Sequence, residues 1–161
     1  MSEMASGTRA ATPAEVEVVG QRVLATLVDA AVLFVVALGV FVTHWIVGAA
    51  VTIAGAPDVV QIAVGILGML VILAIPALFV AYYVYFEGSK GQTIGKMVCG
   101  IKVVREDTGG LPGTKAALVR TLLRVVDGML GYLVGLLFAL SSERRQRLGD
   151  MAAHTLVIRR G

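Results

Sequence analysis

The sequence predicts an all-α membrane protein: a transmembrane helical hairpin followed by a third re-entrant or short membrane helix. Two observations support this prediction. Hydrophobic residues make up 57% of the 161 residues and charged residues 16%, whereas about 45–50% and about 25% are usual in soluble domains. In addition, two apolar stretches are each longer than the about 20 residues that a helix needs to cross a bilayer. The chain is too short to hold a separate soluble domain as well.

The first predicted span covers residues from about 25 to 48, within the apolar run "VLATLVDAAVLFVVALGVFVTHWIVGAAV". Its strongly polar interruptions are Asp29 and His44, and Trp45 is placed as an interfacial anchor. Residues 1–20 are small and polar and resemble no signal peptide, because a basic stretch followed by an apolar core is missing. We expect them to form a disordered cytoplasmic tail, and residues 21–161 to form the membrane domain.

The second predicted span covers residues 59–86 and follows a short turn, "TIAGAPD", that contains glycine and proline. It includes one polar side chain near its start, Gln61, and a proline that predicts a kink, Pro76. Three tyrosines near its end, at positions 82, 83 and 85, are typical of a membrane interface. The two spans together predict a helical hairpin.

The distribution of basic residues predicts the orientation of the hairpin. No lysine or arginine occurs from residue 23 to 89, whereas Arg9 and Arg22 precede the first span and many basic residues follow the second. Basic residues remain preferentially on the cytoplasmic side. We therefore expect a multi-pass protein of the cell membrane with a cytoplasmic N-terminus.

The third apolar segment, residues 125–140, allows two interpretations. As a helix its 16 residues would rise only about 24 Å, which is less than the about 30 Å of the hydrocarbon core. A complete third span would also place five following arginines outside the cell. We favour a re-entrant or oblique helix, broken near Gly128 or Gly131, over a simple third span.

Two short segments, "CGIKVVR" (99–105) and "HTLVIRR" (154–160), have the β-branched alternation of strands. If they pair in a small cytoplasmic sheet, both ends of the third segment and the C-terminus lie in the cytoplasm. Between them, residues 113–124 alternate apolar and basic side chains and predict an amphipathic helix at the inner interface.

Asp29 is the strongest candidate for a functional residue, since a carboxylate inside a membrane helix costs about 2.5–3.5 kcal/mol at the helix centre. Arg22 lies seven residues earlier, on the same helix face. One hypothesis is a buried polar network that fixes the segments in register, with Asp29 paired to arginines of the cytoplasmic side. The other is transport, with Asp29 as a cation or proton site.

Most of the remaining charged residues are expected to bind lipid headgroups, and one is a candidate for the polar network. Asp127 is a second acidic candidate for the polar network. Anionic lipid headgroups are the expected partners of seven basic residues: Lys90, Lys96, Arg120, Arg124, Arg144, Arg145 and Arg147. In a chain this apolar, the net charge of +3 favours headgroups over nucleic acid.

A glycine-rich loop at residues 87–104 superficially suggests a phosphate-binding loop. That motif requires glycine five positions before Gly95 and a hydroxyl residue after Lys96. The sequence has Lys90 and Met97 there instead, so the nucleotide interpretation fails. We instead expect this loop to connect the hairpin to a cytoplasmic cap.

Three motifs in order resemble the RDD family of small membrane proteins, named for one arginine and two aspartates. They are "QRVLATLVDAAVLF", with Arg22 and Asp29; "EGSKGQTIGKMVCGIKVVRED"; and "RRQRLGDMAAHTLVIRR", with Asp150 as the second aspartate. The resemblance implies a membrane protein of undefined molecular role. Transport of unknown ligands has been proposed for the family, and some members are linked to cation/proton exchange.

His154 departs from the glycine or alanine that is usual at this point of the family pattern. With two histidines and a single cysteine, Cys99, the sequence offers no cluster for a metal and no catalytic triad. We expect no enzyme activity and no cofactor. The glycines at positions 128, 131 and 135 predict close helix packing, either within the monomer or in a homo-oligomer, or against another membrane protein.

Overall fold

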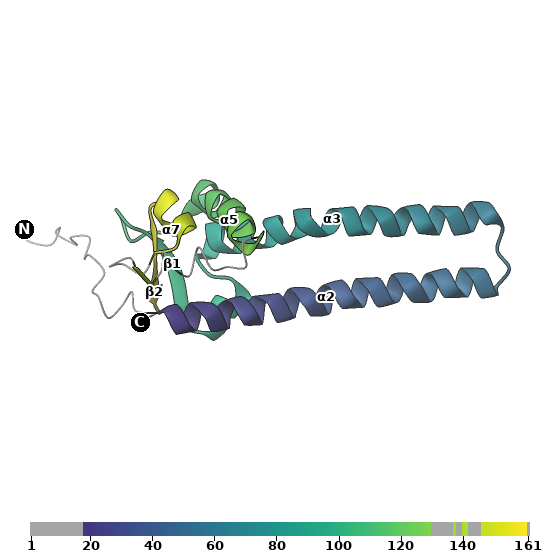
Figure 1. Cartoon of the computed structure of the whole chain (residues 1–161), viewed down its shortest axis with the longest axis horizontal. Coiled ribbons are helices and arrows are strands. Elements are labelled where there is room, and N and C mark those ends of the chain that lie inside the picture. The colour runs from purple at the N-terminus through teal and green to yellow at the C-terminus, as the bar shows by residue number, and fades with distance from the viewer. Residues whose placement is uncertain (1–17, 130–136, 138–139, 142–145, 161) are drawn as a thin grey trace, which may run out of the picture. The chain divides into compact units, whose positions relative to one another are not determined.

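The computed structural model describes residues 18–129, 137, 140–141 and 146–160. Its elements occur in the order α2 (Val19–Ile53), α3 (Asp58–Lys90), α4 (Ile94–Val98), β1 (Ile101–Arg105), α5 (Gly113–Met129), α7 (Leu148–Ala152) and β2 (Thr155–Arg159) (Figure 1). The predicted tail at residues 1–17, most of the predicted third segment from residue 130 to 140, and Arg144 and Arg145 lie outside the described residues.

The chain divides into two compact units. One unit, here called the hairpin unit, comprises Ala30–Ala81. The other, here called the cap unit, comprises the described residues of Met1–Asp29 and Tyr82–Gly161. The helices α2 and α3 each contribute residues to both units, so the same two helices provide an apolar part and a charged part.

The hairpin unit contains the part of α2 from residue 30 onward and the part of α3 up to residue 81, which are antiparallel and joined by residues 54–57 (Figure 1). Both helices are long and apolar enough to cross a membrane, and they include the predicted spans 25–48 and 59–86. Only 11% and 6% of the residues in their most apolar windows are buried, so most of these apolar residues are exposed in the structure. At about 1.5 Å per residue, each exceeds the about 30 Å of a hydrocarbon core.

The predicted pairing of the two short strands is confirmed. β1 and β2 form a two-stranded antiparallel sheet in which Val103 lies opposite Val157. The backbone N–H of Arg160 donates to the carbonyl of Gly100 over 2.7 Å and extends the pairing beyond the strands. On its other edge, β1 donates from the Val103 N–H to the Gly91 carbonyl over 2.7 Å, which fixes the glycine-rich loop to the sheet.

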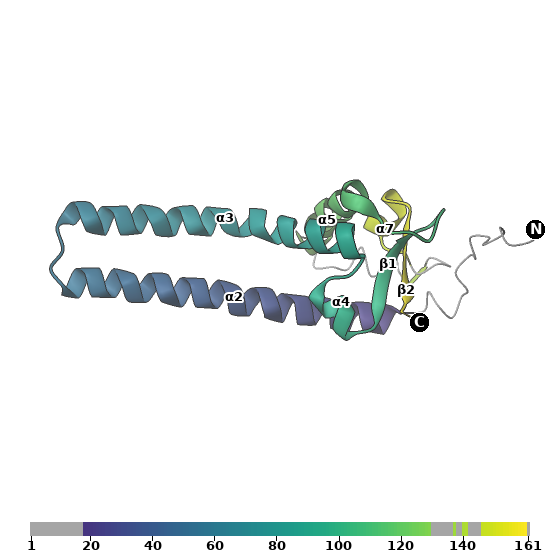
Figure 2. The ribbon, with the colours of Figure 1, turned by 180° about the vertical axis from the view of Figure 1, so that it is seen from behind.

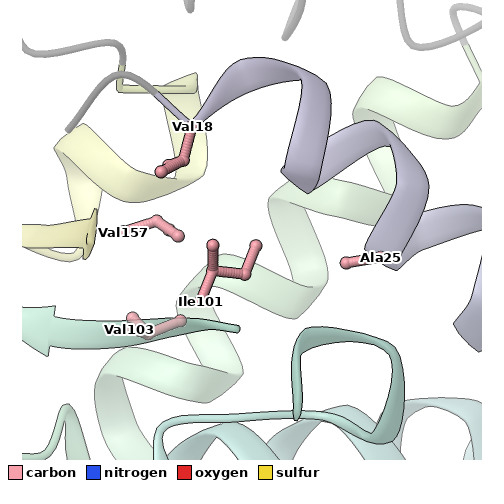
Figure 3. Packing of buried hydrophobic residues seen from close by; sticks show 5 residues of the cluster. All are labelled: Val18, Ala25, Ile101, Val103 and Val157. Carbon is pink, nitrogen blue, oxygen red and sulfur yellow. The ribbon is translucent and has the colours of Figure 1, made fainter. Parts of the chain in front are cut away.

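A small hydrophobic core joins this sheet to the start of α2. Ile101, Val103 and Val157 from the strands face Val18, directly before α2, and Ala25 of α2 (Figure 3). All five side chains are at most 1% exposed. The cap unit therefore has a core of its own, formed by the strands and the first turns of a helix whose later part is apolar on its surface.

The predicted amphipathic helix is longer than expected. α5 begins at Gly113 as predicted, but it continues to Met129 instead of ending at residue 124. It packs against α7, where a Cβ on Gly149 would lie 3.3 Å from the carbonyl oxygen of Arg120. A glycine at this position therefore allows α7, and Asp150 with it, to approach α5 closely.

His154 occupies a backbone conformation that favours glycine. Its φ is 48°, in the left-handed region, where residues with a Cβ are disfavoured. This turn connects α7 to β2, and the His154 carbonyl accepts from the backbone N–H of Glu106 over 3.0 Å. His154, which replaces the glycine or alanine of the family pattern, therefore lies in a turn.

Candidate functional site

Asp29 belongs to α2, and its carboxylate contacts the first turn of the short helix α4, which Figure 2 shows beside α2. Its Oδ1 accepts from the backbone N–H of Gly95 over 2.7 Å and from the Tyr82 hydroxyl over 2.9 Å. Its Oδ2 accepts from the Thr93 hydroxyl over 2.6 Å. The carboxylate is 1% exposed, and the three donors given by the structure are all neutral. These hydrogen bonds replace those that water would make with a polar group of this kind at the surface.

The glycine-rich loop explains why this arrangement is possible. A Cβ on Gly95 would lie 2.1 Å from the backbone oxygen of Ala25 and 2.9 Å from the Asp29 carboxyl group. Only glycine lets the backbone of α4 approach α2 closely enough to donate to Asp29. The loop therefore does bind an anion with its backbone, and this anion is the carboxylate of the chain itself.

Glu87, near the end of α3, is the first of two carboxylates at the centre of the charge network. Its Oε1 accepts from Lys96 Nζ over 2.7 Å and from Arg124 Nη2 over 2.5 Å. Its Oε2 accepts from Arg120 Nε over 3.0 Å. Glu87 is 0% exposed, so the three cations together compensate for the loss of water around one buried charge.

Asp150, on α7, is the second central carboxylate. Arg22 Nη1 donates to its Oδ2 over 2.7 Å, and Arg120 Nη1 donates to its Oδ1. The backbone N–H of Arg147 also donates to Oδ2, over 3.1 Å. Arg22 in addition donates from Nη2 to the carbonyl of Val157, over 3.5 Å. Asp150 therefore ties α2 and α5 to the region around β2.

Arg120 joins the two carboxylates into one network. It pairs with Glu87 through Nε and with Asp150 through Nη1. Arg120 Nη1 also donates to the Thr155 hydroxyl at the start of β2. In total the network connects residues of α2, α3, α4, α5, α7 and β2, all within the cap unit. A further contact places the Arg124 guanidinium 4.0 Å from the centre of the Tyr83 ring, a cation–π geometry.

The network shifts the titration of its members outside the long helices. Burial alone would raise the pKa of Asp150, but Arg120, Arg22 and the Arg147 N–H outweigh this effect and lower it to about 2. Because the folded-state pKa is depressed, this carboxylate stabilises the fold above about pH 4. That contribution is lost as the pH falls toward 2.

Lys96 shows the opposite balance. Burial lowers the pKa of Lys96 to about 7, because the stabilising effect of Glu87 is offset in part by the neighbouring Arg120 and Arg124. Glu87 pairs with three cations, so its negative charge stabilises the Lys96 ammonium less than it would in an isolated pair. Lys96 is therefore the member of the network closest to titration at neutral pH.

A polar cavity of about 40 Å³ lies beside the network. Its lining combines basic, acidic and apolar side chains of the cap unit: Arg22, Thr26, Lys96, Arg120, Leu123, Arg124, Asp127, Arg147, Leu148, Gly149, Asp150 and Val157. Asp29 and Glu87 are not part of this lining. No group of three metal-ligating side chains gathers within the described ranges of the chain.

The structure brings some predicted site residues together and separates others. Arg22 and Asp150 form a direct ion pair, whereas Asp29 binds neutral donors and Asp127 lines the cavity. Lys96, Arg120 and Arg124, which we assigned to lipid headgroups, turn inward to Glu87 and Asp150. Arg147 lines the cavity, and Lys90 is exposed with its ammonium 5.1 Å from the Phe86 ring centre.

Sequence reasoning missed Glu87, the residue with the most ion pairs in the network. A signal was present, because Glu87 is the only acidic residue between Asp58 and Glu106 and directly follows an apolar span. The neighbouring Thr93 was also missed, although a threonine before a short helix is a common N-cap. In the structure it accepts from the Lys96 N–H over 3.3 Å while donating to Asp29.

Fold and site together define a class of protein. Proteins of this class have two helices that are apolar enough to cross a membrane. They also have a buried charge network that includes residues near the start of the first helix and near the end of the second. The model of the RDD family matches residues 16–154. The chain belongs to the RDD family, and the family and the two helices fit a membrane protein.

Curated relatives match a limited part of the chain. Proteins named proline-rich antigen homolog, from two strains of Mycobacterium tuberculosis, are 38% identical over 76 residues. A proline-rich antigen of Mycobacterium leprae is 37% identical over 76 residues. These alignments cover 47% of this chain but only 30–31% of the relatives, so the chain matches less than a third of their length. No solved structure matches this chain.

Proposed function

We propose that the chain is a multi-pass protein of the cell membrane in which the charge network, with its Arg22 and Asp150 pair, and the hydrogen-bonded Asp29 carboxylate together act as a structural lock. In this proposal the protein is a non-transporting scaffold or accessory subunit of a membrane complex, assembled from copies of itself or with another membrane protein. It performs no catalytic step. Both the N-terminus and the C-terminus lie in the cytoplasm, and the bilayer surrounds the hairpin unit.

The observation that carries this proposal is the sharing of two buried carboxylates among residues from six elements. Glu87 is fully buried and Asp150 is 4% exposed, and every carboxylate oxygen of the pair accepts at least one hydrogen bond. Removing one charged side chain from such a network destabilises the fold, because the charge that it paired with stays buried without its partner. The network therefore favours one fixed arrangement of the helix ends and the sheet.

The sheet supports the proposed topology. β1 precedes the third apolar segment in the chain and β2 follows it, and the two strands share a ladder. Strands on opposite sides of a bilayer could not share backbone hydrogen bonds. A segment that leaves and returns on the same side, as a re-entrant helix does, is compatible with this pairing. The many basic residues near the sheet agree with a cytoplasmic location.

The environment of Asp29 favours the lock over a transport site. Its two oxygens accept from three fixed donors, and it does not line the cavity. A carboxylate that exchanges protons or cations needs a path to water. Transport of a small ligand, or cation/proton exchange, remains the second candidate function because a polar cavity lies close to other charged residues of the same unit.

The experiment that separates the two functions compares Asp29→Asn with wild type in the same preparations. Ion and proton flux is measured in proteoliposomes, and thermal unfolding is measured in detergent. The lock predicts no flux from wild type and a lowered melting temperature for Asp29→Asn. Asp58→Asn is the matched control, since Asp58 is an exposed carboxylate in the first turn of α3.

The opposite pattern would support transport. In that case wild type would carry a pH-dependent or cation-dependent flux, and Asp29→Asn would abolish it without lowering the melting temperature. An Asp29→Asn protein that melts like wild type would contradict the lock, whatever the flux.

A further inference from the structure

The cavity beside the charge network has an excess of positive charge. Five basic side chains line it, from Arg22, Lys96, Arg120, Arg124 and Arg147, against two carboxylates, from Asp127 and Asp150. Glu87 stands behind this lining and pairs with three of the basic groups. Even when Glu87 is included, the basic side chains outnumber the acidic ones.

Two hydrogen-bond donors among these groups have no partner in the described part of the chain. They are Nε of Arg22 and Nη1 of Arg124, and both atoms are buried. Arg22 as a residue is only 4% exposed. A guanidinium N–H that is shielded from solvent without an acceptor costs free energy. Both residues line the same cavity, so one acceptor group placed there could serve both.

The carboxylates of Glu87 and Asp150 accept from other donors of the network. Oδ1 of Asp150 accepts from Arg120, and Oδ2 accepts from Arg22 and the Arg147 N–H. Both oxygens of Glu87 are likewise engaged, with Lys96, Arg120 and Arg124. Neither Arg22 Nε nor Arg124 Nη1 is among the donors that reach these two carboxylates.

We propose that this cavity binds one phosphate group, carried either by a lipid headgroup or by free inorganic phosphate. A phosphate group presents oxygens in several directions, and guanidinium groups bind such oxygens with paired N–H donors. The volume of about 40 Å³ has room for roughly three water-sized groups, which is the scale of one small polyatomic anion. The excess of basic groups selects an anion over a cation.

This inference does not depend on the proposed lock. A bound phosphate would add acceptors to a network that holds the fold, and it would equally be compatible with a transported ligand. A failure of phosphate binding would leave the predictions on Asp29 unchanged.

The first measurement uses the full chain in a maltoside detergent that contains no phosphate. Inorganic phosphate is titrated by calorimetry and thermal unfolding, with chloride at equal ionic strength as the reference. In a second arm, the same protein is titrated with phosphatidylglycerol and with a diacylglycerol of identical acyl chains that lacks the phosphate. Preference for phosphate or for phosphatidylglycerol supports the site and identifies the source.

Two variants test whether binding occurs at the cavity. Arg147→Gln removes one lining charge from a side chain that makes no ion pair among those found in the described residues. Arg124→Lys keeps a positive charge that can still pair with Glu87 but removes the unpartnered Nη1. We expect each to weaken binding about tenfold, the loss associated with one charge-assisted hydrogen bond.

The matched control is Arg105→Gln, which makes the same change of charge on an exposed residue paired with Asp107 outside the cavity. It should bind phosphate like wild type. Circular dichroism verifies that each variant is folded, and the phosphate-dependent rise in the wild-type melting temperature provides evidence that requires no variant. The proposal is overturned if wild type prefers neither phosphate-containing ligand, or if the cavity variants and Arg105→Gln bind equally.

Discussion

The hairpin unit and the cap unit differ in which kinds of side chain they expose and which they bury. In the hairpin unit large apolar side chains are exposed: Phe34 and Leu73 are 65% exposed and Trp45 is 66% exposed. In the cap unit, by contrast, charged side chains are enclosed, with Glu87 at 0% and Arg22 and Arg120 at 4%. Both kinds of environment occur along the same helices, since α2 and α3 contribute to each unit.

This difference shows that one helix can have an apolar surface along one part of its length and buried charged side chains along another part. Exposed apolar residues over many turns are compatible with lipid, which is as apolar as the side chains themselves. The buried charges require protein partners, because a lone charge removed from water is strongly unfavourable. The helices α4, α5 and α7 and the small sheet supply those partners. The stability of the cap unit should therefore depend on single residues, and that of the hairpin unit on overall composition.

The largest effect is expected at Glu87. Glu87→Gln removes the one carboxylate shared by Lys96, Arg120 and Arg124 and leaves three buried cations around a neutral group. We expect a loss of about 3–5 kcal/mol in unfolding free energy, measured by thermal or denaturant unfolding in detergent. Asp107→Asn is the control, since the Arg105 to Asp107 pair is exposed on both sides. An equal effect of the two substitutions would contradict the contrast between buried and exposed pairs.

A smaller but still large effect is expected at Gly95. Gly95→Ala places a methyl group 2.1 Å from the Ala25 backbone oxygen, which must separate α4 from α2 and weaken the bonds to Asp29. A loss of about 3 kcal/mol is expected, at the upper end for overpacking. Gly39→Ala, at a helical glycine of the hairpin unit with no neighbouring atom within 4 Å of the new Cβ, should be neutral or stabilising. A tolerated Gly95→Ala would mean that α4 does not need this close approach.

The third prediction compares apolar truncations in the two units. Val103→Ala removes buried methyl groups from the core of the cap unit, where Val103 is 0% exposed, and should cost about 2 kcal/mol. Leu73→Ala removes a larger side chain, but one that is exposed in the hairpin unit and would face lipid both before and after unfolding of the cap. It should change the melting temperature very little. If Leu73→Ala were the more damaging change, the surface of the hairpin unit would have to be an interface between proteins.

The smallest expected effect is a pH dependence due to Lys96. The pKa of Lys96 is lowered to about 7 in the folded chain, whereas an unfolded lysine titrates near about 10.4. Between these values the unfolded chain binds more protons, so stability should rise with pH, by at most about 1.4 kcal/mol per pH unit. Melting curves from about pH 7.5 to 8.5 measure this slope, so that the whole change stays within about 1.4 kcal/mol. Lys96→Met should flatten it, and a slope unchanged by Lys96→Met would assign the titration to another group.

The sequence anticipated features that depend on local pattern or on sums over many residues. The two apolar helices follow from composition and length, and the pairing of β1 with β2 from the alternation in "CGIKVVR" and "HTLVIRR". The family motifs also identified Arg22 and Asp150 before their contact was known. None of these features depends on which side chains contact one another in the folded chain.

The network itself could not be derived in this way. Asp29 was expected to pair with arginines, yet it binds Thr93, Tyr82 and the Gly95 N–H. Arg120 and Arg124 were expected to reach outward to headgroups, yet they turn inward to Glu87. An amphipathic pattern gives the face on which a residue lies but not what covers that face.

The sequence alone determined that two stretches of this chain are apolar enough for a membrane, because transfer into lipid depends on side-chain composition summed over about 20 residues. It also determined the strand pairing and the family. Only the tertiary structure decided the ion-pair partners, because Arg22 and Asp150 are 128 residues apart in sequence and meet only after α2, α5 and α7 have packed. The choice of partner for a buried charge is a matter of distances within a few ångströms, and those distances exist only in the folded cap unit.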